Sequence, residues 1–396
     1  MIARLSFIFL LLIGGSAGLP AQPQKVDWRT IAPGVEHAEI RRNGANGDLW
    51  AINALRVDLA QARLDVVHAL DAAVGLETVS SIAQRRDAVA AINGGYFRTT
   101  GTFRGDSTGT LQIDRTLLSE PDRARAAVGF VRTSAGATQL IFGHVTWDAA
   151  IDAGGKKRAL DGINRPRGAD EMVMFTPAFH QTTLTDASGT EIVVRRGRVV
   201  EVREQAGSTP IPADGFVLSA KGAARDWARE HLKRRAKVKV SAALKPADDA
   251  AASSAAQSAA TKASAKNPWA TAEDVVGGGP RIVTAGRVDI TLDREKVQPS
   301  FSTTRHPRTA IASLPGNKAL LVVVDGRQPA LSVGMSLDEL ARLMIELGAV
   351  EAINLDGGGS STMTIDGKVV NHPSDVTGER PVSDAILVLP ATRRPG

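Results

Sequence analysis

The amino-acid sequence predicts an α+β protein in which mixed, strand-rich sheets are flanked by a few helices. Short apolar or alternating runs recur along most of the chain, and turns containing glycine separate them. The last third instead carries a strand, a helix and a second strand in succession. The 396 residues are 43% hydrophobic and 23% charged, which is normal for a globular protein of one large or two ordinary domains.

The strand-like segments begin at Leu49. Residues 49–58 alternate apolar and polar side chains, and residues 190–194 and 198–202 predict a hairpin. The other clear runs are residues 64–68, 126–132, 139–147, 171–175, 272–276, 281–283 and 287–290. Residues 79–86 predict a short helix capped by Ser80 or Ser81, and residues 222–235 predict a basic surface helix.

The C-terminal third predicts a β-α-β unit. Residues 319–324 are a continuous apolar strand that ends at Asp325, and residues 350–355 are a second strand that Asp356 follows. The helix between them shows a capping box, an apolar stripe and a glycine C-cap, formed by Ser336 with Glu339, by Leu337, Leu340, Met344 and Leu347, and by Gly348. Parallel strands with a right-handed crossover would place both aspartates at the same, carboxyl-terminal edge.

The chain divides into a leader, one large domain and a short tail. Arg4, the apolar residues 5–13 and the small residues up to Ala21 predict a signal peptide over residues 1–21, and hence an exported protein, periplasmic or secreted. Residues 22–48 are interpreted as a lead-in, 49–390 as the domain and 391–396 as a tail. Residues 241–268 are rich in Ala, Ser and Lys and predict a flexible insertion. The chain has no cysteine, which excludes disulfides, thiolate metal sites and a cysteine nucleophile.

Asp356 and the residues after it are the most distinctive stretch. Three glycines, 357–359, and three hydroxyl residues, 360–362, follow the carboxylate. Consecutive glycines allow a sharp turn and a close approach to a ligand, and the amides of such a turn can bind an anion. Similar glycine clusters follow apolar runs at residues 93–97 and 277–280.

The segment Arg305-His306-Pro307-Arg308-Thr309 is the second distinctive stretch. Pro307 disfavours a helix at His306, and alternate residues of an extended chain share a face. His306 and Arg308 would therefore point together, with Arg305 opposite. An arginine fork can bind two phosphate oxygens at once.

Other kinds of site find little support. The chain has no Walker lysine, no Gly-x-Ser-x-Gly elbow and no His-x-x-x-His pair, so no cofactor is predicted. Asp356, Asp325 and Asp106 are the residues that could hold a divalent cation through oxygen ligands. The net charge of +6 is modest, and the basic residues 221–240 have no series of stacking aromatics, which argues against nucleic acid.

Taken together, these motifs resemble the phosphodiester glycosidase family, over a stretch from about Leu49 to Leu389. The resemblance rests on residues 91–97, 277–280, 305–310 and 354–363. It implies hydrolysis of the bond between a sugar's anomeric carbon and a phosphodiester oxygen, in an envelope or extracellular polysaccharide or glycoconjugate. The substrate itself does not follow from membership. The Ala/Ser/Lys insertion puts the surroundings of the distal part of the substrate in doubt.

Site roles follow from combining this resemblance with the residues present. Asp356 is expected to act as nucleophile or to activate water, Asp325 to be the second carboxylate and His306 to supply a proton. The expected phosphate ligands are Arg308 and the amides of Gly357, Gly358, Gly359 and Ser360, with Arg305 and Arg327 as further cations. Asn93, Ser360 and Thr362 are expected to position sugar hydroxyls. Gly94, Gly95, Gly278, Gly279 and Thr309 complete the expected wall of the site.

Two alternatives remain open. The protein could bind anionic polysaccharide without catalysis, as an accessory of exopolysaccharide assembly. It could instead be a metal-dependent phosphodiesterase that cuts P–O rather than C–O. In each case the expected partner is a phosphorylated sugar or polysaccharide, with no nucleic acid and no integral membrane span once the signal peptide is removed.

Overall fold

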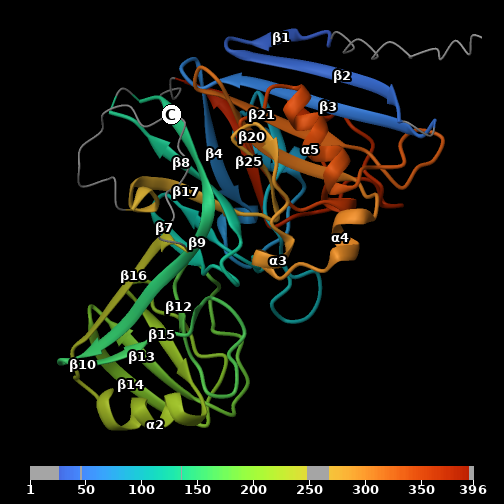
Figure 1. Ribbon diagram of the computed structural model, residues 1–396. Helices are drawn as coiled ribbons and strands as arrows, with labels where there is room; N and C mark the ends of the chain where they lie inside the picture. Colours follow the sequence, from blue (N-terminus) through green and yellow to red (C-terminus); the bar gives the residue numbers. More distant parts are fainter. Residues whose placement is uncertain (1–25, 45–46, 135, 248–266, 392–396) are drawn as a thin grey trace, which may run out of the picture.

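The computed structural model describes residues 26–391 apart from 45–46, 135 and 248–266, and it shows a larger lobe with a smaller one beneath it (Figure 1). Four sheets and a few short helices make up these residues, which confirms the predicted α+β class. The helices are α1 (Val79–Arg85), α2 (Gly222–His231), α3 (Leu292–Glu295), α4 (Pro299–Thr303) and α5 (Leu337–Glu346). Short 3-10 turns occupy Ala69–Asp71, Pro268–Thr271 and Gly358–Ser360. Among the described residues, no helix has both the length and the apolar character needed to cross a membrane.

An eight-stranded sheet is the largest sheet of the larger lobe. Its order is β1 (Arg29–Ala32), β2 (Val35–Asn43), β3 (Leu49–Asp58), β21 (Lys318–Val324), β20 (Arg308–Leu314), β22 (Glu351–Asn354), β18 (Arg281–Thr284) and β19 (Arg287–Val288). Every neighbouring pair in it is antiparallel. Because β21 and β22 both pair with β20, they run in the same direction with one strand between them. The two strands of the predicted β-α-β unit are therefore parallel without being adjacent.

Helix α5 lies between these two strands in the chain and packs on the sheet. The predicted capping box is present, since Ser336 Oγ accepts from the Glu339 amide at 3.2 Å and Glu339 Oε2 accepts from the Ser336 amide at 2.9 Å. The stripe residues Leu337, Leu340 and Met344 are fully buried, in one cluster with side chains of β20, β21 and β22. Gly348 ends the helix with φ +97°, a conformation that glycine adopts without strain.

A five-stranded sheet faces the first one. Its order is β24 (Lys368–Val369), β23 (Met363–Ile365), β5 (Ala90–Asn93), β25 (Asp384–Pro390) and β4 (Ala62–His68). The main core joins the two sheets, with Leu321 and Ile353 on one side and Ile92, Met363 and Ile386 on the other. The chain passes from β22 to β23 through residues 355–362, so the glycine turn after Asp356 connects the two sheets.

Of the two remaining sheets, one extends from the larger lobe into the smaller lobe, and the other lies in the smaller lobe (Figure 1). One has the order β10 (Lys156–Ala159), β9 (Thr138–Ala153), β8 (Ala126–Arg132), β17 (Ala272–Gly277), β6 (Leu111–Ile113) and β7 (Thr116–Ser119), with β16 (Val238–Pro246) also paired to β9. The other has the order β11 (Gly162–Ile163), β12 (Met172–Phe175), β15 (Gly215–Ala220), β13 (Thr190–Arg195) and β14 (Arg198–Glu204). The predicted hairpin is β13 and β14. Only β11 and β12 pair in parallel among the described strands.

Several sequence predictions need correction. The lead-in contains β1 and β2, and β2 pairs with β3 along its whole length, with Ala38 and Ile40 buried against α5's cluster. The start of the predicted insertion is the end of β16, because this strand is held by β9 and by packing of Leu244 on Trp269. Thr78, rather than a serine, caps α1, and α2 ends at His231. Residues 1–21, 248–266 and 392–396 lie outside the described residues.

Candidate active site

The site residues meet at one edge of the eight-stranded sheet. Strands β21 and β22 end there at Val324 and Asn354, while β20, which runs the opposite way between them, begins there with Arg308. Asp325 and Asp356 thus follow strands that end at the same edge, as the sequence predicted. The antiparallel strand between them adds the segment from Arg305 to Thr309 to the same place.

Asp356 is a half-buried carboxylate at the start of the glycine turn. The Gly357 amide donates to its Oδ1 at 2.9 Å. Burial raises the pKa of Asp356 to about 6, although hydrogen bonds from Ser360 and Gly357 and the charge of Arg380 oppose the shift. The nearby charge of Asp384 raises the pKa further. The carboxyl is therefore mostly ionised at pH 7 and becomes protonated under mildly acidic conditions.

The glycine turn is a closed structure rather than an open anion cradle. Gly358 has φ +63°, and its amide donates to the Pro307 carbonyl at 2.9 Å. The amide of Ser360 donates to the Gly357 carbonyl, and the amide of Gly357 is held by Asp356. Three of the four amides expected to bind phosphate are thus bonded within the protein, and Gly359 alone has an unbonded amide among the described residues.

Two guanidinium groups lie against this turn, and they are the groups near it that could bind a phosphate in place of the amides. A Cβ on Gly358 would lie 3.0 Å from Nη2 of Arg327, and a Cβ on Gly359 would collide with Nη2 of Arg380. Arg380 is fixed by two hydrogen bonds to Asp375, at 2.7 and 2.9 Å, and its Nη1 lies 3.5 Å from Ser360 Oγ. The absence of side chains on both glycines is therefore what lets two cations approach the turn, and the charge of Arg380 reaches Asp356. Arg327 was among the residues predicted for the site, whereas Arg380, which sits in a loop with no distinctive motif, was not.

His306 lies beside one of these cations. Arg327 Nη2 is 3.4 Å from His306 Nδ1, and because arginine can only donate, Nδ1 accepts and the proton of the neutral ring is on Nε2. Burial, together with the charges of Arg308 and Arg327, lowers the pKa of His306. A bound phosphate would offset these charges, so that the imidazole could hold a proton once substrate is present.

The other two arginines of this segment have structural contacts instead. The buried guanidinium of Arg308 donates to the carbonyls of Met335, Phe301 and Thr304, at 2.8–2.9 Å, and stacks 4.9 Å from the Phe301 ring centre. Burial lowers the pKa of Arg308 to about 10, which leaves it charged at neutral pH. Arg305 is paired with Asp48 and with Glu339 at the start of α5. All three side-chain nitrogens of Arg305, and the Nε and Nη2 groups of Arg308, are therefore engaged within the protein.

Asp325 likewise serves the local structure. The buried carboxylate accepts from Asn371 Nδ2 and from the His372 amide, both at 2.9 Å, and burial raises its pKa. Asp384 is instead the carboxylate that affects the ionisation of Asp356. It accepts from the Gly95 amide at 2.9 Å, and Gly94 must lack a side chain because a Cβ would collide with Oδ1 of Asp384. The sequence search looked for polar residues at strand ends, and Asp384 was missed because it begins its strand, β25.

The polar residues expected to bind the sugar form hydrogen bonds with one another and with the backbone of Asp356. Asn93 donates to the Asp356 carbonyl at 2.8 Å and accepts from Thr309 Oγ1 at 2.8 Å and from the Thr362 amide at 3.1 Å. These bonds join β5, β20 and the glycine turn. Thr362 Oγ1 is buried and has no partner. Asn93, Thr309 and Thr362 are therefore better described as supports of Asp356 than as ligands of a sugar.

Tyr96 is a further neighbour of Asp356 that the predicted site omitted. Its hydroxyl donates to the Gly279 carbonyl at 2.9 Å and accepts from Asn354 Nδ2 at 2.8 Å. Burial raises the pKa of Tyr96, and the charge of Asp356 adds to this effect. Gly278 and Gly279 form the opposite side of this contact, where a Cβ on Gly278 would lie 2.5 Å from the Asn354 carbonyl.

The three aspartates considered for a cation do not form a cluster. Asp106 is buried beside Arg98, at 3.1 Å, and burial raises its pKa to about 7. Asp325 is held by residues 371 and 372, away from both. Among the described residues, no group of three or more His, Asp or Glu side chains is placed to hold a metal ion.

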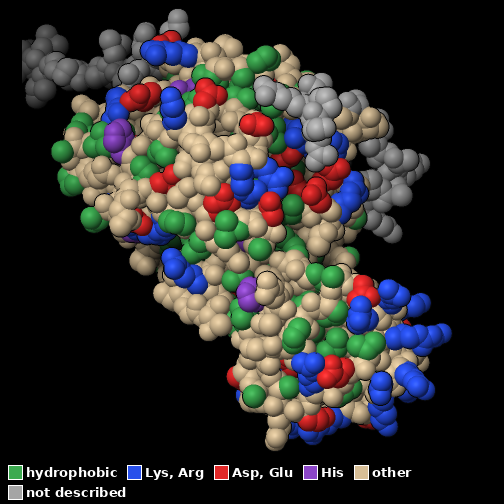
Figure 2. Space-filling model, turned by 180° about the vertical axis from the view of Figure 1, so that it is seen from behind, with side chains coloured by type: hydrophobic (Ala, Val, Ile, Leu, Met, Phe, Trp, Pro, Cys, Tyr) green, Lys and Arg blue, Asp and Glu red, His purple; other side chains and the backbone are tan. Residues whose placement is uncertain are grey.

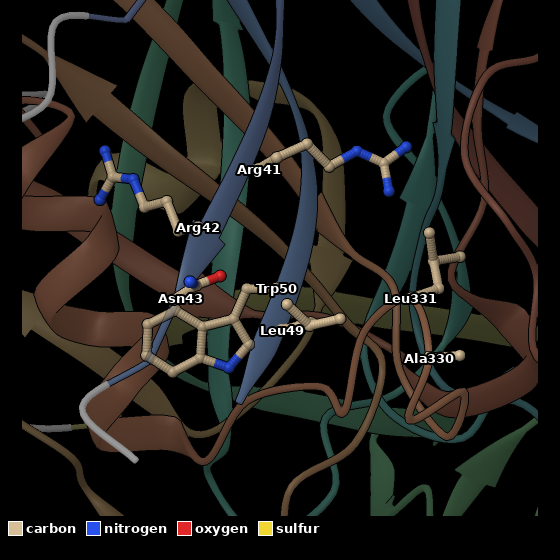
Figure 3. Close-up of a pocket in the computed structure, with 7 residues that line it drawn as sticks. All are labelled: Arg41, Arg42, Asn43, Leu49, Trp50, Ala330 and Leu331. Carbon is tan, nitrogen blue, oxygen red and sulfur yellow. The ribbon is translucent and has the colours of Figure 1, made fainter. Parts of the chain in front are cut away.

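A hollow of about 430 Å³ lies on the far side of the loop that follows Arg327 (Figure 3). Leu331 and Ala330 of this loop face Trp50 and Leu49 across it, and the Val333 amide ties the loop to the Leu49 carbonyl at 3.0 Å. The hollow contains none of the residues around Asp356. The residues around Asp356 lie instead at the edge of the eight-stranded sheet.

Comparisons with known proteins find relatives that share this fold. Solved structures of a hypothetical protein from Synechocystis and of a Burkholderia pseudomallei protein share the fold, with TM-scores of 0.76 and 0.78 and 23% identity in each case. They cover 94% and 98% of this chain, and 64% and 100% of their own chains.

Sequence matches to curated proteins are shorter. One, an uncharacterized SPbeta prophage-derived protein of Bacillus subtilis, is 36% identical over 84 residues, or 21% of this chain and 13% of that protein. Another, N-acetylglucosamine-1-phosphodiester alpha-N-acetylglucosaminidase of Bos taurus, is 38% identical over 68 residues, or 17% and 12%. Each match thus spans about one eighth of the relative. The pattern of the phosphodiester glycosidase family matches residues 188–389, about half of the chain, and this protein therefore belongs to the phosphodiester glycosidase family.

Proposed function

We propose that this protein hydrolyses the glycosidic bond of a sugar-1-phosphodiester. Family membership supports a glycosidase-like activity on phosphodiester-linked sugars. The observation that carries the proposal is the position of Asp356, a carboxylate with a pKa of about 6, beside a turn against which Arg327 and Arg380 are pressed. A carboxylate and two cations are what the departure of a phosphate from an anomeric carbon requires.

The two guanidinium groups bind the phosphate and stabilise the charge that develops on it. The bond between the anomeric carbon and the phosphate oxygen breaks, and the phosphate monoester leaves with the electron pair. This leaving group is a weak base, so it needs little protonation. Ionised Asp356 stabilises the positive charge on the sugar. It either attacks the anomeric carbon, forming a glycosyl ester that water then hydrolyses to release the sugar and the carboxylate, or it takes a proton from the water that attacks directly. His306, next to Arg327, exchanges the remaining proton with solvent.

The test is hydrolysis of the methyl ester of N-acetylglucosamine 1-phosphate by the wild-type protein and by Asp356→Asn. The matched control is Asp366→Asn, because Asp366 is an exposed aspartate in the turn between β23 and β24. We expect release of reducing sugar to fall at least about a thousandfold in Asp356→Asn and to stay unchanged in the control. Equal rates in all three proteins would refute the assignment, and binding without turnover in wild type would favour the non-catalytic binder.

The finer context of this activity is also a proposal. The pattern of residues 1–21 supports export, and the cation pair supports an envelope or extracellular glycan as substrate. Fractionation of cells that express the full chain, beside a chain lacking residues 2–21, tests the export. Recovery of the full chain in the cytoplasmic fraction would contradict it. Activity that is abolished by a chelator and restored by a divalent cation would instead favour the metal-dependent phosphodiesterase.

A further inference from the structure

The net positive charge of this chain comes from the smaller lobe. Residues 146–247 hold 18 Lys and Arg against 12 Asp and Glu, a net charge of +6. The rest of the chain holds 30 of each, so the lobe carries the entire excess. Figure 2 shows the Lys and Arg side chains gathered along one side of this lobe. A one-sided charge of this kind attracts polyanions over distances comparable to the Debye length.

Many of these cations are not neutralised by the lobe's own acids. Lys157, Lys233, Arg234, Lys237 and Lys239 are exposed, and none of them has an ion-pair partner within 4.0 Å among the described residues. The strand register places Lys157 and Lys239 on the two strands that flank the same residue of β9, and Lys237 beside a further arginine. Lys157 of β10 and Lys239 of β16 both lie opposite Asp152 of β9, and Lys237 forms a bridge with Arg198, the first residue of β14.

This basic side contains a groove of about 790 Å³ between β14 and the end of α2. Lys233 and Arg234 lie on one wall, and Val200 and Val202 lie on the other. Both valines are unusually exposed, at 39% and 37%. Arg229, Glu201 and Glu204 also line the groove. Glu204 is ion-paired with Arg229 at 2.7 Å and Glu201 with Arg203 at 2.8 Å, so that each carboxylate already has a partner. The groove thus offers apolar contact together with two unpaired cations.

We propose that this basic groove binds the chain of a polymeric substrate, a glycan whose sugars are joined by phosphodiesters. The inference rests on the proposed function, because it assigns that activity to a polymer. Phosphates at regular intervals suit the unpaired Lys and Arg side chains, and the apolar faces of the sugars suit the two valines. None of the residues that line the groove is aromatic, and Trp227 of α2 is stacked on His231 at 4.8 Å and packed against the core of the lobe, which does not suit the stacking of nucleic-acid bases.

Strand β9 joins the two lobes, so that a polymer bound to the smaller lobe would be held at a fixed place relative to Asp356 in the larger lobe. Strand β9 has 16 residues and extends from β8 in the larger lobe to β10 and β16 in the smaller one, a length of about 50 Å. The lobes are therefore joined by a continuous ladder rather than by a flexible linker. A polymer held in the groove has its other phosphodiesters kept near Asp356, which raises their effective concentration and lowers KM without changing kcat.

The test uses the charge reversal Lys233→Glu with Arg234→Glu. The matched control reverses two exposed cations of the larger lobe, Lys368→Glu with Arg123→Glu, and so changes the net charge by the same amount. The probes are a homopolymer of N-acetylhexosamine 1-phosphate and the monomeric methyl diester. We expect KM for the polymer to rise about tenfold in the groove variant alone, with KM for the monomer unchanged. Raising the salt from 50 to 500 mM should bring wild-type KM for the polymer close to that of the variant.

Binding of the polymer to Asp356→Asn proteins separates this inference from the proposed function. If the inactive protein binds the polymer and the groove reversal abolishes binding, the groove is supported even if no hydrolysis is found in wild type. If hydrolysis is found but the reversal leaves KM for the polymer unchanged, the inference is wrong while the function stands. Equal binding to phosphatidylglycerol vesicles, lost in the same variant, would also overturn it, because the surface would then bind membranes.

Discussion

Replacing Asp356 by asparagine is expected to stabilise the folded protein at neutral pH while abolishing hydrolysis. Burial raises the pKa of Asp356 to about 6, whereas an aspartate in an unfolded chain has a pKa of about 3.9. The folded state therefore holds the proton more tightly than the unfolded state. The ionised carboxylate costs stability above pH 6, and this cost disappears as the pH falls below about 4.

The size of the effect follows from the shift. About two pKa units at about 1.4 kcal/mol each give a cost of about 3 kcal/mol at pH 7.5, and about 1 kcal/mol at pH 4.5. Asparagine does not ionise, and its amide oxygen can still accept from the Gly357 amide. With an unfolding entropy of about 2 cal/mol/K per residue, the melting temperature should rise by about 4 °C at pH 7.5 and by about 1 °C at pH 4.5.

Differential scanning calorimetry of wild type, Asp356→Asn and Asp366→Asn between pH 4.5 and 8 measures this. The control should show no gap that depends on pH, because Asp366 is exposed. A lower melting temperature of Asp356→Asn at pH 7.5, or a gap that stays constant across the range, would refute the reasoning that the site holds a carboxylate at a cost in stability.

Three further predictions concern individual neighbours of the site. Arg380 lowers the pKa of Asp356 and Asp384 raises it. The acidic limb of the profile of kcat/KM against pH, near pH 6, should therefore move to higher pH in Arg380→Ala and to lower pH in Asp384→Asn. Shifts in the same direction would contradict this. Arg327→Ala should raise KM for the monomeric diester at least about tenfold. Arg305→Ala should leave KM unchanged and lower the free energy of unfolding in urea by about 1–2 kcal/mol, because its two ion pairs are lost. The reverse result would identify Arg305 as a phosphate ligand. Gly359→Ala should reduce kcat/KM at least about a hundredfold because its Cβ displaces Arg380, while Gly143→Ala, whose Cβ meets only Trp269 at 3.4 Å, should remain active.

The sequence predicted much of the fold because most elements carry local signals. The alternation in residues 49–58 corresponds to β3, and the spacing of Ser336 and Glu339 identified the start of α5. Strand β2 was missed because its outward side chains are polar, and only pairing with β3 makes it a strand. Residues 241–246 have little strand propensity of their own, and their place in β16 is fixed by β9, about a hundred residues earlier.

The sequence predicted which segments would meet at the sheet edge, but not the contacts that their side chains make. The position of Asp356 at a strand end was readable, and so was the need for glycine after it. Arg308 donates to the carbonyls of residues 301, 304 and 335. These contacts depend on where α4 packs, and no local sequence pattern shows that. Arg380 and Asp384 reach the site through the return of the chain into β25, so their role is visible only in the folded protein.

The central claim is that Asp356 assists cleavage of the bond between a sugar and a phosphodiester oxygen. Hydrolysis of the methyl diester of N-acetylglucosamine 1-phosphate in water enriched in oxygen-18, followed by mass spectrometry of both products, tests it most directly. We predict that the label enters the sugar, that the released methyl phosphate carries none, and that Asp356→Asn forms neither product. Label in the phosphate, or undiminished turnover by Asp356→Asn, would contradict the account.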